Sequence, residues 1–495
     1  PMPLTPLIDS EPASIEDTTH IKGWLVDLGW WPTVYKERDL TVDSKKKKLT
    51  KEKYKDAVER YMTQTMESPF KRDRMFHLTL GMKCKDEQVL SKLLSHDLER
   101  PMKVHTNPTF TVGQDKELCP KLEEMSEIFP HVYKVVEFLT YRHRRNSILG
   151  GGVGIDEDDI EMEKGYLANI RADGRIPTPA DTCGCNTSRF KHRIVTNIPR
   201  TTSMYGKNMR AMFGVERKKY AQFGYDFSSL EGRMESHYCW KYDETKEYCN
   251  SLVLEKPFDV HTLTAKKISE ILCKEFKRTP AKNVKYCCTY GGRPMRVAKT
   301  IGSDFETGKQ VYDAFWLAAD PLRQLGESLK KYWETIGGKK FVLGIDGRKV
   351  PTRSASALVN SLLQSAGVIC AKWTMVLHDR KLAAKDLTVD FFRDDWRNKT
   401  YINQMVAMHD EAQMEVSKGL IEWKIFKEED EAIAFKKSSS DNWSEVGHIG
   451  GKWFVGKSVI SDLLLEAVDE TTAKLKLNIP LGVEFIYGDS WATCH

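Results

Sequence analysis

The sequence predicts a mixed α+β fold divided into several domains. The chain has 495 residues, which is too long for one hydrophobic core and, at about 150 residues per domain, suggests roughly two to four units. Apolar residues at Ile21, Trp24, Leu25 and Leu28 repeat with the spacing of a helix. Around residues 405–416, apolar residues alternate with the spacing of strands. Because both patterns are present, we expect helices and sheet together.

Charge and composition favour a cytoplasmic protein that is able to contact nucleic acid. The 76 Lys and Arg residues exceed the 70 Asp and Glu residues only slightly, but the cations gather in clusters, as in nucleic-acid-binding proteins and many other enzymes. The 11 cysteines lack the spacing of a zinc site, which indicates reduced thiols. No apolar run approaches the roughly 18 residues of a membrane-spanning helix, so we expect no membrane partner.

Helices are predicted at both ends of the N-terminal region. Gly29 and Pro32 end the first helix, and we expect Trp24, Trp30 and Trp31, in or beside that helix, to pack in a core. Residues 120–149 again have helical spacing, with Val132, Val135, Val136 and Leu139 on one face.

A charged stretch, residues 38–104, separates these helices. Its run Lys45–Lys48 indicates a solvated surface or, alternatively, a contact with a duplex backbone. Further along, Gly150–Asp159 lacks the spacing of a phosphate-binding loop and is interpreted as a linker.

Two segments far apart in the sequence each carry an acid next to a predicted strand. Tyr220, Phe223 and Tyr225 have β character and lead to Asp226, after which we expect a helix to open at Ser228 or Ser229. The acidic turn His409–Glu411 joins two alternating segments, which predicts a hairpin. An aspartate beside a strand is often only a turn residue. A pair of them, however, suits a divalent cation.

A basic helix is predicted between these acids, over Arg278–Gly292. We expect Thr279 to cap it, Pro280 to take its first position and Gly291–Gly292 to end it. Four residues spaced four apart form one stripe on this helix: Arg278, Lys282, Tyr286 and Tyr290. The cations near the N-terminus add to the helix dipole and suit a triphosphate, although a basic, aromatic outer face is the alternative.

Taken in order, these segments resemble the motifs of family A DNA polymerases, most closely the replicative enzymes of short-tailed phages. The resemblance covers most of residues 14–36 and 105–495, although Ser188 stands where glycine is usual. The similar segments read TSRFKHRIVTNIPR at Thr187–Arg200, YDFSSLEGR at Tyr225–Arg233, RTPAKNVKYCCTYGG at Arg278–Gly292, NSLLQSAG at Asn360–Gly367, QMVAMHDEAQMEV at Gln404–Val416 and GDSWATCH at Gly488–His495.

The resemblance implies a right-hand polymerase architecture with palm, fingers and a partial thumb. Its expected domains are a thumb remnant at 1–145 with the charged insertion at about 38–104, a first palm segment at 146–245, fingers at 246–345 and a second palm segment at 346–495. The implied function is template-directed DNA synthesis in phage DNA replication, in the host cytoplasm, on primer–template DNA with dNTPs.

The resemblance also assigns roles to individual residues. Two Mg²⁺ ions, or Mn²⁺ in their place, would be held by Asp226, Asp410 and the carbonyl of Phe227, and such ions activate a hydroxyl and neutralise a triphosphate. Catalytic roles are expected for Asp226, Asp410, Glu411 and Lys282. The dNTP would meet Glu231, His261, Arg278, Lys282, Tyr286 and Tyr290, of which Glu231 fills the space of a 2′-hydroxyl. Glu231 also completes the S-x-x-E pattern of a capping box that starts at Ser228. DNA would meet Arg189, Asn360, Gln364 and His409.

Some parts of the family pattern have no counterpart in this sequence. We find neither the N-terminal exonuclease domain with its D-x-E motif nor the first thumb helix, so we expect no proofreading. The missing parts, or a processivity factor, are then expected on a partner chain. Two other functions remain open. Glu231 and the His-Asp-Glu turn argue against a single-subunit RNA polymerase, and the intact acids argue against an inactive DNA-binding subunit.

Tyr286 generates a prediction about substrate use. Family members with tyrosine at this position accept dideoxynucleotides, whereas members with phenylalanine resist them. We therefore expect primer extension to terminate efficiently when dideoxynucleotides are mixed with dNTPs at equal concentration. Strong discrimination against the dideoxy form would contradict the alignment of this helix.

Overall fold

The computed structural model describes residues 18–32, 35–43, 47–67, 75–77, 82–83, 87–112, 117–150, 153–155, 161–163, 165–196, 198–391 and 399–494. The chain divides into two compact units, Pro1–Ala168 and Asn169–His495. Among the described residues, no helix combines the length and apolar character that a membrane crossing requires.

The first unit contains two small cores. One is formed by the first helix and the helices near residue 125, and it buries Ile21, Leu25, Trp30, Leu122 and Val132. The other lies within the charged insertion and buries residues of its helices and of a strand pair, among them Leu40, Val58, Leu93 and Val104. The elements are α1 (Thr18–Asp27), β1 (Tyr35–Asp39), α2 (Lys51–Glu67), β2 (Met75–His77), β3 (Met82–Lys83), α3 (Glu87–Leu94), β4 (Lys103–Pro108), β5 (Thr111–Val112), β6 (Glu117–Leu118), α4 (Pro120–Ile128), α5 (Pro130–Leu149), β7 (Val153–Ile155) and β8 (Glu161–Glu163).

Several expectations for this unit need correction. The single helix predicted over 120–149 is two helices, because Phe129 is extended and Pro130, which lacks an N–H, starts α5. Trp30 is fully buried as expected, but Trp24 is 39% exposed because it lies on the solvent side of α1. Part of the expected linker Gly150–Asp159 is strand β7, which pairs with β8.

The lysine run is only partly described. Lys45 and Lys46 lie outside the described residues, while Lys48 forms an ion pair with Glu99 on the surface of the insertion. This contact agrees with a solvated surface and leaves the alternative of a duplex contact untested.

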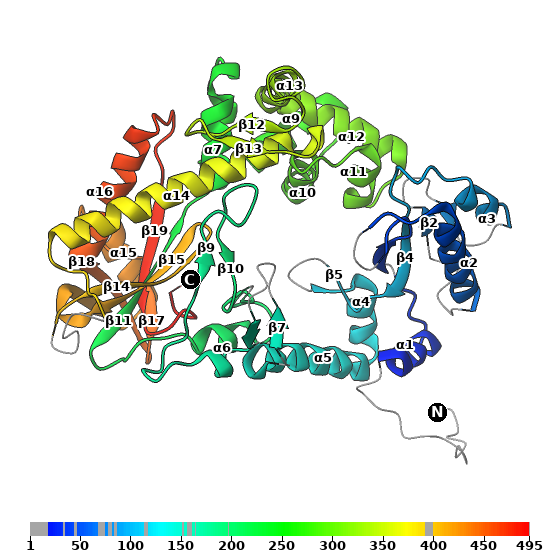
Figure 1. The fold of residues 1–495 in the computed structure, drawn as a ribbon. Coiled ribbons are helices and arrows are strands. Elements are labelled where there is room, and N and C mark those ends of the chain that lie inside the picture. Colours follow the sequence, from blue (N-terminus) through cyan, green and yellow to red (C-terminus); the bar gives the residue numbers. More distant parts are fainter. Residues whose placement is uncertain are drawn as a thin grey trace, which may run out of the picture. The chain divides into compact units, whose positions relative to one another are not determined.

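The second unit is organised around a four-stranded antiparallel sheet in the order β14-β15-β11-β19. Its strands are β11 (Tyr220–Phe227), β14 (Ile402–Met408), β15 (Glu411–Ser417) and β19 (Val483–Gly488). The helices α7 (Leu230–Cys239), α14 (Leu358–Ala384) and α16 (Val459–Lys474) contribute to the same core, and α14 runs beside α16 (Figure 1). Phe223, Met234 and Leu464 are fully buried there.

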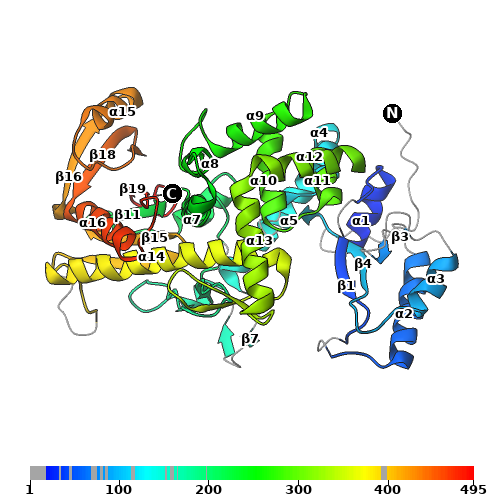
Figure 2. The ribbon, with the colours of Figure 1, turned by 90° about the horizontal axis from the view of Figure 1, so that it is seen from above.

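A helical region is inserted between β11 and β14. It contains α8 (Glu247–Ser251), α9 (Val260–Leu272), α10 (Arg278–Thr289), α11 (Pro294–Ile301), α12 (Phe305–Ala318) and α13 (Asp320–Thr335), followed by the hairpin β12 (Phe341–Leu343) and β13 (Lys349–Pro351). These helices share a core separate from that of the sheet and cluster together in Figure 2. Smaller elements are β9 (Ala180–Asp181), β10 (Lys191–His192) and α6 (Gly206–Ala211).

A second sheet follows the hairpin that carries residues 409–411. It has the order β16-β18-β17, with β16 (Ile421–Phe426), β17 (Gly447–Ile449) and β18 (Lys452–Ser458), and α15 (Glu429–Ser438) packs against it. This sheet contacts β19 through β17 and β18.

Two helix starts differ from the sequence prediction. Helix α7 begins at Leu230 after Ser229, which has a left-handed φ of 52° and makes no side-chain cap bond, so the capping box from Ser228 is wrong. Helix α10 begins at Arg278 after Lys277, so Thr279 does not cap it. Pro280 still lies in the first turn, where a missing N–H is tolerated.

Gly224 in β11 tests the packing of the C-terminal tail against the sheet. A Cβ atom there would lie 2.2 Å from the Cys494 carbonyl oxygen and 2.7 Å from Gln413 Nε2. We expect Gly224→Ala to lower the free energy of unfolding by about 1–3 kcal/mol because the tail or the strand has to move. Thermal or denaturant unfolding measures this, with Gly419→Ala as control, since no atom lies within 4 Å of a Cβ there. Equal effects of the two substitutions would contradict the tight packing.

Candidate active site

The pairing of β11 with β15 brings together the two acids that the sequence singles out. Asp226 is the register partner of Glu411, and the backbone N–H of Phe227 donates to the carbonyl of Asp410 over 3.3 Å. The predicted hairpin is confirmed, because β14 and β15 pair with Met408 opposite Glu411. His409 adopts a left-handed φ of 60° in its two-residue turn. Asp226, Phe227 and Asp410 therefore meet at one end of the sheet.

The chemistry of this sheet end fits a hard divalent cation. The Asp226 side chain is exposed, and that of Asp410 is partly exposed. Carboxylate and carbonyl oxygens with access to solvent are the ligands that Mg²⁺ prefers, because it retains several waters. The donor set therefore fits the metal that the sequence analysis expects.

The Glu411 side chain contacts the C-terminal tail and α6. Its carboxylate accepts hydrogen bonds from Trp491 Nε1 and from Gln413 Nε2, the latter over 2.8 Å, and lies 3.7 Å from Arg210 Nη1. Arg210 also lies over the Trp491 ring, 5.0 Å from its centroid. Glu411 thus links the hairpin to the C-terminal tail and to α6. In the sequence, only the resemblance of the tail to the family motif indicates that the tail lies near the palm, and no pattern indicates Arg210.

The predicted stripe on α10 is confirmed by burial. Lys282, Tyr286 and Tyr290 are exposed, whereas the opposite face of the helix is buried through Ala281, Val284, Lys285 and Cys288. Gly291, with φ of 79°, follows the helix, and the Gly292 N–H returns to the Cys287 carbonyl over 2.7 Å. These glycines end the helix as predicted.

The stripe reaches Glu231 through its last tyrosine. Tyr290 donates a hydrogen bond to Glu231 Oε2 over 3.3 Å, and the Tyr286 ring stacks beside Tyr290 with centroids 6.4 Å apart. Arg189 donates to the other oxygen of Glu231 over 3.3 Å. His261 lies beside Tyr286, with ring centroids 5.8 Å apart. These residues thus form one chain of contacts, which includes Arg189, a residue predicted to bind DNA.

Arg278 is held at the start of the stripe by an acid. Its guanidinium forms hydrogen bonds with both oxygens of Asp259, which also caps α9 through the Thr262 N–H. Burial acts to raise the pKa of the Asp259 carboxyl. The hydrogen bonds from Arg278 and Thr262 outweigh this effect and hold the pKa below its usual value. Arg278 is therefore positioned by Asp259 rather than standing alone, which its spacing does not reveal.

His261 is neutral at neutral pH. Burial and the positive charge of Lys285 lower its pKa to about 4, with Arg278 and Lys282 acting in the same direction against Asp259. Its Nδ1 is buried without a hydrogen-bond partner. Any contact of this imidazole with a ligand is therefore that of a neutral group.

The residues predicted to contact DNA lie in three segments. His409 lies in the hairpin turn near His192, with ring centroids 6.2 Å apart, and burial together with Arg189 lowers its pKa. Asn360 and Gln364 are partly buried on the first two turns of α14. The sequence analysis did not single out His192, and only its place within the TSRFKHR segment could have suggested it.

Ser188 occupies the turn where the resembled motif has glycine. Its φ is 62°, the left-handed region that favours glycine. Arg348 donates to its hydroxyl over 2.7 Å, and Lys372 donates to its carbonyl over 2.7 Å. The turn therefore keeps the glycine-like backbone, stabilised by two cations.

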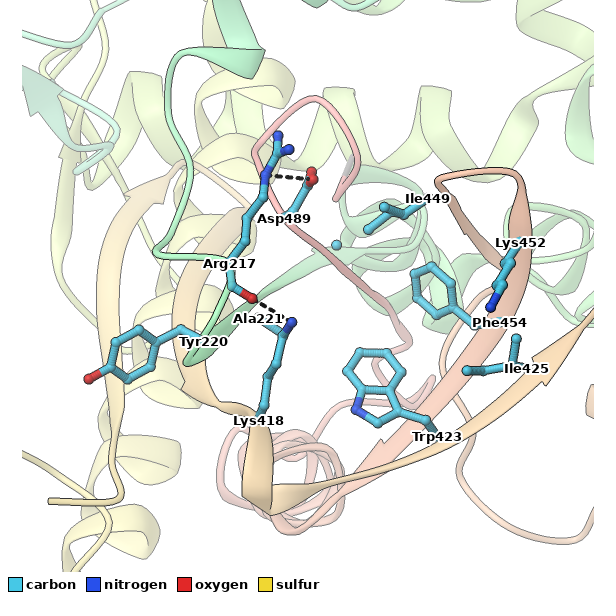
Figure 3. A pocket seen from close by; sticks show the side chains of 11 residues that line it. Arg217, Tyr220, Ala221, Lys418, Trp423, Ile425, Ile449, Lys452, Phe454 and Asp489 are labelled. Atoms are coloured by element: carbon cyan, nitrogen blue, oxygen red, sulfur yellow. Dashed lines mark hydrogen bonds and ion pairs between the residues drawn. The ribbon is translucent and has the colours of Figure 1, made fainter. Parts of the chain in front are cut away.

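An apolar pocket lies at the opposite end of β11. It has a volume of about 310 Å³, and Tyr220, Ala221, Trp423 and Phe454 contribute to its wall (Figure 3). The start of β11 lines it, whereas Asp226 lies near the strand's other end. The acids therefore lie outside this pocket, which belongs to the junction of the two sheets.

The fold has the α+β, right-hand architecture that the sequence predicts, with an antiparallel sheet and a helical region inserted between two of its strands. The model of DNA polymerase family A matches residues 162–429, more than half of the chain. The chain belongs to this family.

Curated relatives agree with this assignment. The DNA-directed DNA polymerase of Escherichia phage T7 is 28% identical over 274 residues, covering 51% of this chain and 37% of the relative. The enzyme of Enterobacteria phage T3 is 28% identical over 287 residues, 53% of this chain and 38% of the relative. That of Escherichia phage Phieco32 is 23% identical over 337 residues, 52% of this chain and 51% of the relative. The chain thus spans between 37% and 51% of the length of these relatives.

A solved structure supports the fold. The POL domain of Pol1 from M. smegmatis, in complex with DNA primer-template and dNTP, superimposes with a TM-score of 0.53 at 16% identity, covering 89% of this chain and 66% of that chain. At this identity the likeness concerns the fold.

The hydrogen bond from Trp491 to Glu411 generates a prediction about stability. Trp491→Phe keeps an aromatic ring beside Arg210 but removes the N–H donor from a buried carboxylate. We expect this change to cost about 1–3 kcal/mol of unfolding free energy, measured by denaturant titration. Trp443→Phe is the control, because Trp443 is also buried and its Nε1 has no hydrogen-bond partner. A loss no larger than that of the control would mean that the bond contributes nothing.

Proposed function

We propose that this chain is a DNA-directed DNA polymerase that adds dNTPs to the 3′ end of a primer. The observation that carries the proposal is the pairing of Asp226 with the Asp410 hairpin at one sheet end, together with the α10 stripe that reaches Glu231. Family membership supports the same activity. Primer–template DNA and dNTPs are the proposed partners.

The proposed metal site consists of Asp226, Asp410 and the carbonyl of Phe227. Two Mg²⁺ ions bound there would lower the pKa of the primer hydroxyl and neutralise charge on the triphosphate. The pairing of β11 with β15 places the two aspartates at one solvent-accessible end of the sheet before substrate arrives, so that little reorganisation of the backbone is needed. Glu411 fixes the hairpin through Trp491 and Arg210, which supports a positioning role for it.

The α10 stripe is proposed to bind the incoming nucleotide. Lys282 is an exposed cation in the first turns of the helix, where the dipole adds to its attraction for phosphate. Arg278, which is held by Asp259, adds a second positive charge at the N-terminal end of α10. His261 contributes a neutral imidazole beside Tyr286. Tyr286 and Tyr290 are then available to the sugar and base.

Glu231 is proposed to exclude a ribonucleotide. Its carboxylate is held between Tyr290 and Arg189, so it cannot easily swing away from a 2′-hydroxyl. This restraint favours a DNA polymerase over an RNA polymerase. On the DNA side, we propose that Arg189, His409, Asn360 and Gln364 contact the primer–template.

The proposal includes the domain assignment and possible partners. We assign α8–α13 and the residues around them, 246–345, to the fingers, residues 146–245 and 346–495 to the palm, and residues 1–145 to a thumb remnant. We assign no 3′–5′ exonuclease to these residues and infer a role in phage replication in the host cytoplasm. A separate exonuclease or processivity subunit is a proposed partner, which co-purification from infected cells would detect.

Asp410 provides the direct test of this function. Wild type should extend a primer with Mg²⁺ and dNTPs, and Asp410→Ala should be slower by about 10³-fold or more, because metal binding contributes several kcal/mol to the transition state. Asp379→Ala, an exposed aspartate on α14, is the matched control and should match wild type.

The same assay separates the alternatives. No primer extension by either wild type or Asp410→Ala would point to an inactive DNA-binding subunit, whereas equal extension by both would overturn the role of Asp410. Use of rNTPs as readily as dNTPs would point to an RNA polymerase. Release of nucleotides from single-stranded DNA by the wild-type chain would overturn the assignment of no exonuclease.

A further inference from the structure

A buried ion pair joins the helix that carries Glu231 to the helix that carries the nucleotide stripe. Lys285 Nζ lies 2.6 Å from Glu235 Oε2, and the two side chains are only 8% and 4% exposed. Tyr248 donates a hydrogen bond to the other carboxylate oxygen. Both oxygens of Glu235 therefore have partners in a region otherwise packed with apolar side chains and cysteines.

The positions of the two charges along their helices connect them to the site. Glu235 is one turn after Glu231 on α7. Lys285 immediately precedes Tyr286 on α10 but faces the protein interior, away from the exposed stripe. A shift between the two helices at the pair would therefore be transmitted to the 3.3 Å contact between Tyr290 and Glu231.

Stability alone does not account for this pair. Removing two charges from water is costly, and apolar side chains of similar volume often serve a core at least as well. What an ion pair supplies in addition is direction and distance, because its hydrogen bonds tolerate only a narrow geometry. In this pair the geometry fixed is that between α7 and α10.

We propose that the Lys285–Glu235 pair is a positioning element for sugar selection, which holds α10 on α7 so that Tyr290 restrains Glu231. The inference rests on the proposed polymerase function and assigns to that site two residues outside its binding surface. Neither side chain is exposed enough to contact substrate, so the pair acts through Glu231 and Tyr290. Lys285 also faces His261, whose pKa it lowers together with burial.

The test replaces the pair by apolar residues of similar size, Glu235→Leu with Lys285→Met, so that no charge is left unpaired. We expect the double variant to fold, with a thermal midpoint lowered only by the loss of the acceptor for the buried Tyr248 hydroxyl. Its KM for dNTPs should rise and its preference for dNTPs over rNTPs should fall, each by about 10- to 100-fold, while kcat changes less. The single variant Glu235→Gln should lose thermal stability as well, because it leaves Lys285 buried without a counter-charge.

Two further variants make the result decisive. Lys267→Met breaks a more exposed ion pair with Glu247 in the same helical region and should leave discrimination unchanged. If the double variant does not fold, Tyr248→Phe, which removes only the hydroxyl that donates to Glu235, should shift discrimination in the same direction by a smaller factor.

The inference would be overturned if a folded double variant kept the wild-type preference for dNTPs over rNTPs and the wild-type KM for dNTPs. If the double variant does not fold, the same result in Tyr248→Phe would overturn it. So would a general loss of activity with an unchanged preference for dNTPs. If the wild-type chain itself extends no primer, the proposed function fails first, and that result is distinguishable from a loss confined to selectivity.

Discussion

The antiparallel pairing of β11 with β15 is the constraint on which the rest of the site depends. A shift of one residue in this register would turn every side chain to the opposite face and would separate Asp226 from the hairpin turn. The register is fixed by burial, since all seven residues of β15 are buried. It is also fixed by a buried hydrogen bond of 2.7 Å between Gln222 and Gln413, one on each strand. Gln222 is opposite Glu415 and Gln413 is opposite Gly224, so this bond joins diagonal neighbours and requires both amides on the same face of the sheet.

Two buried carboxylates, Glu411 and Glu415, join segments distant in sequence around this sheet. Glu411 joins the hairpin to Trp491 and Arg210, and Glu415 accepts from Arg175 and Tyr401, each over 2.7 Å. These carboxylates all have partners, as the cost of burying a charge requires. Together they hold the hairpin from several directions, so the acidic turn has little freedom. A rigid acidic turn is suited to a site that works by preorganised electrostatics.

The helical insertion contacts α7, the helix that follows β11. The exposed stripe of α10 meets α7 at Glu231, which also contacts Arg189 from the segment before the sheet. Nucleotide selection and primer binding, as proposed, therefore share one carboxylate. Because this carboxylate has two partners from different segments, its position depends on the placement of α10 and of the segment that carries Arg189. The proposed role of the Lys285–Glu235 pair follows from the same arrangement.

Local sequence patterns were sufficient for the elements that carry the site. Alternation predicted the hairpin around Asp410, the spacing of four predicted the exposed face of α10, and Gly291–Gly292 marked its end. These features depend on neighbouring residues and on the periods of helices and strands, so the sequence determines them directly. The α+β class followed from the presence of helical and strand periods together, and the family followed from the order of the motifs.

Tertiary structure decided which partner each polar side chain has and where some helices begin. The sequence could not indicate that Arg278 is held by Asp259, Glu411 by Trp491, or Lys285 by Glu235, because these contacts depend on how distant elements pack. The start of α7 after a left-handed Ser229 likewise replaced the capping box that local propensity favours. Packing determines such features because two energies depend on all the surrounding residues. One is the energy of burying a charge, and the other is the energy of the chain reversal between a strand and the helix that follows it.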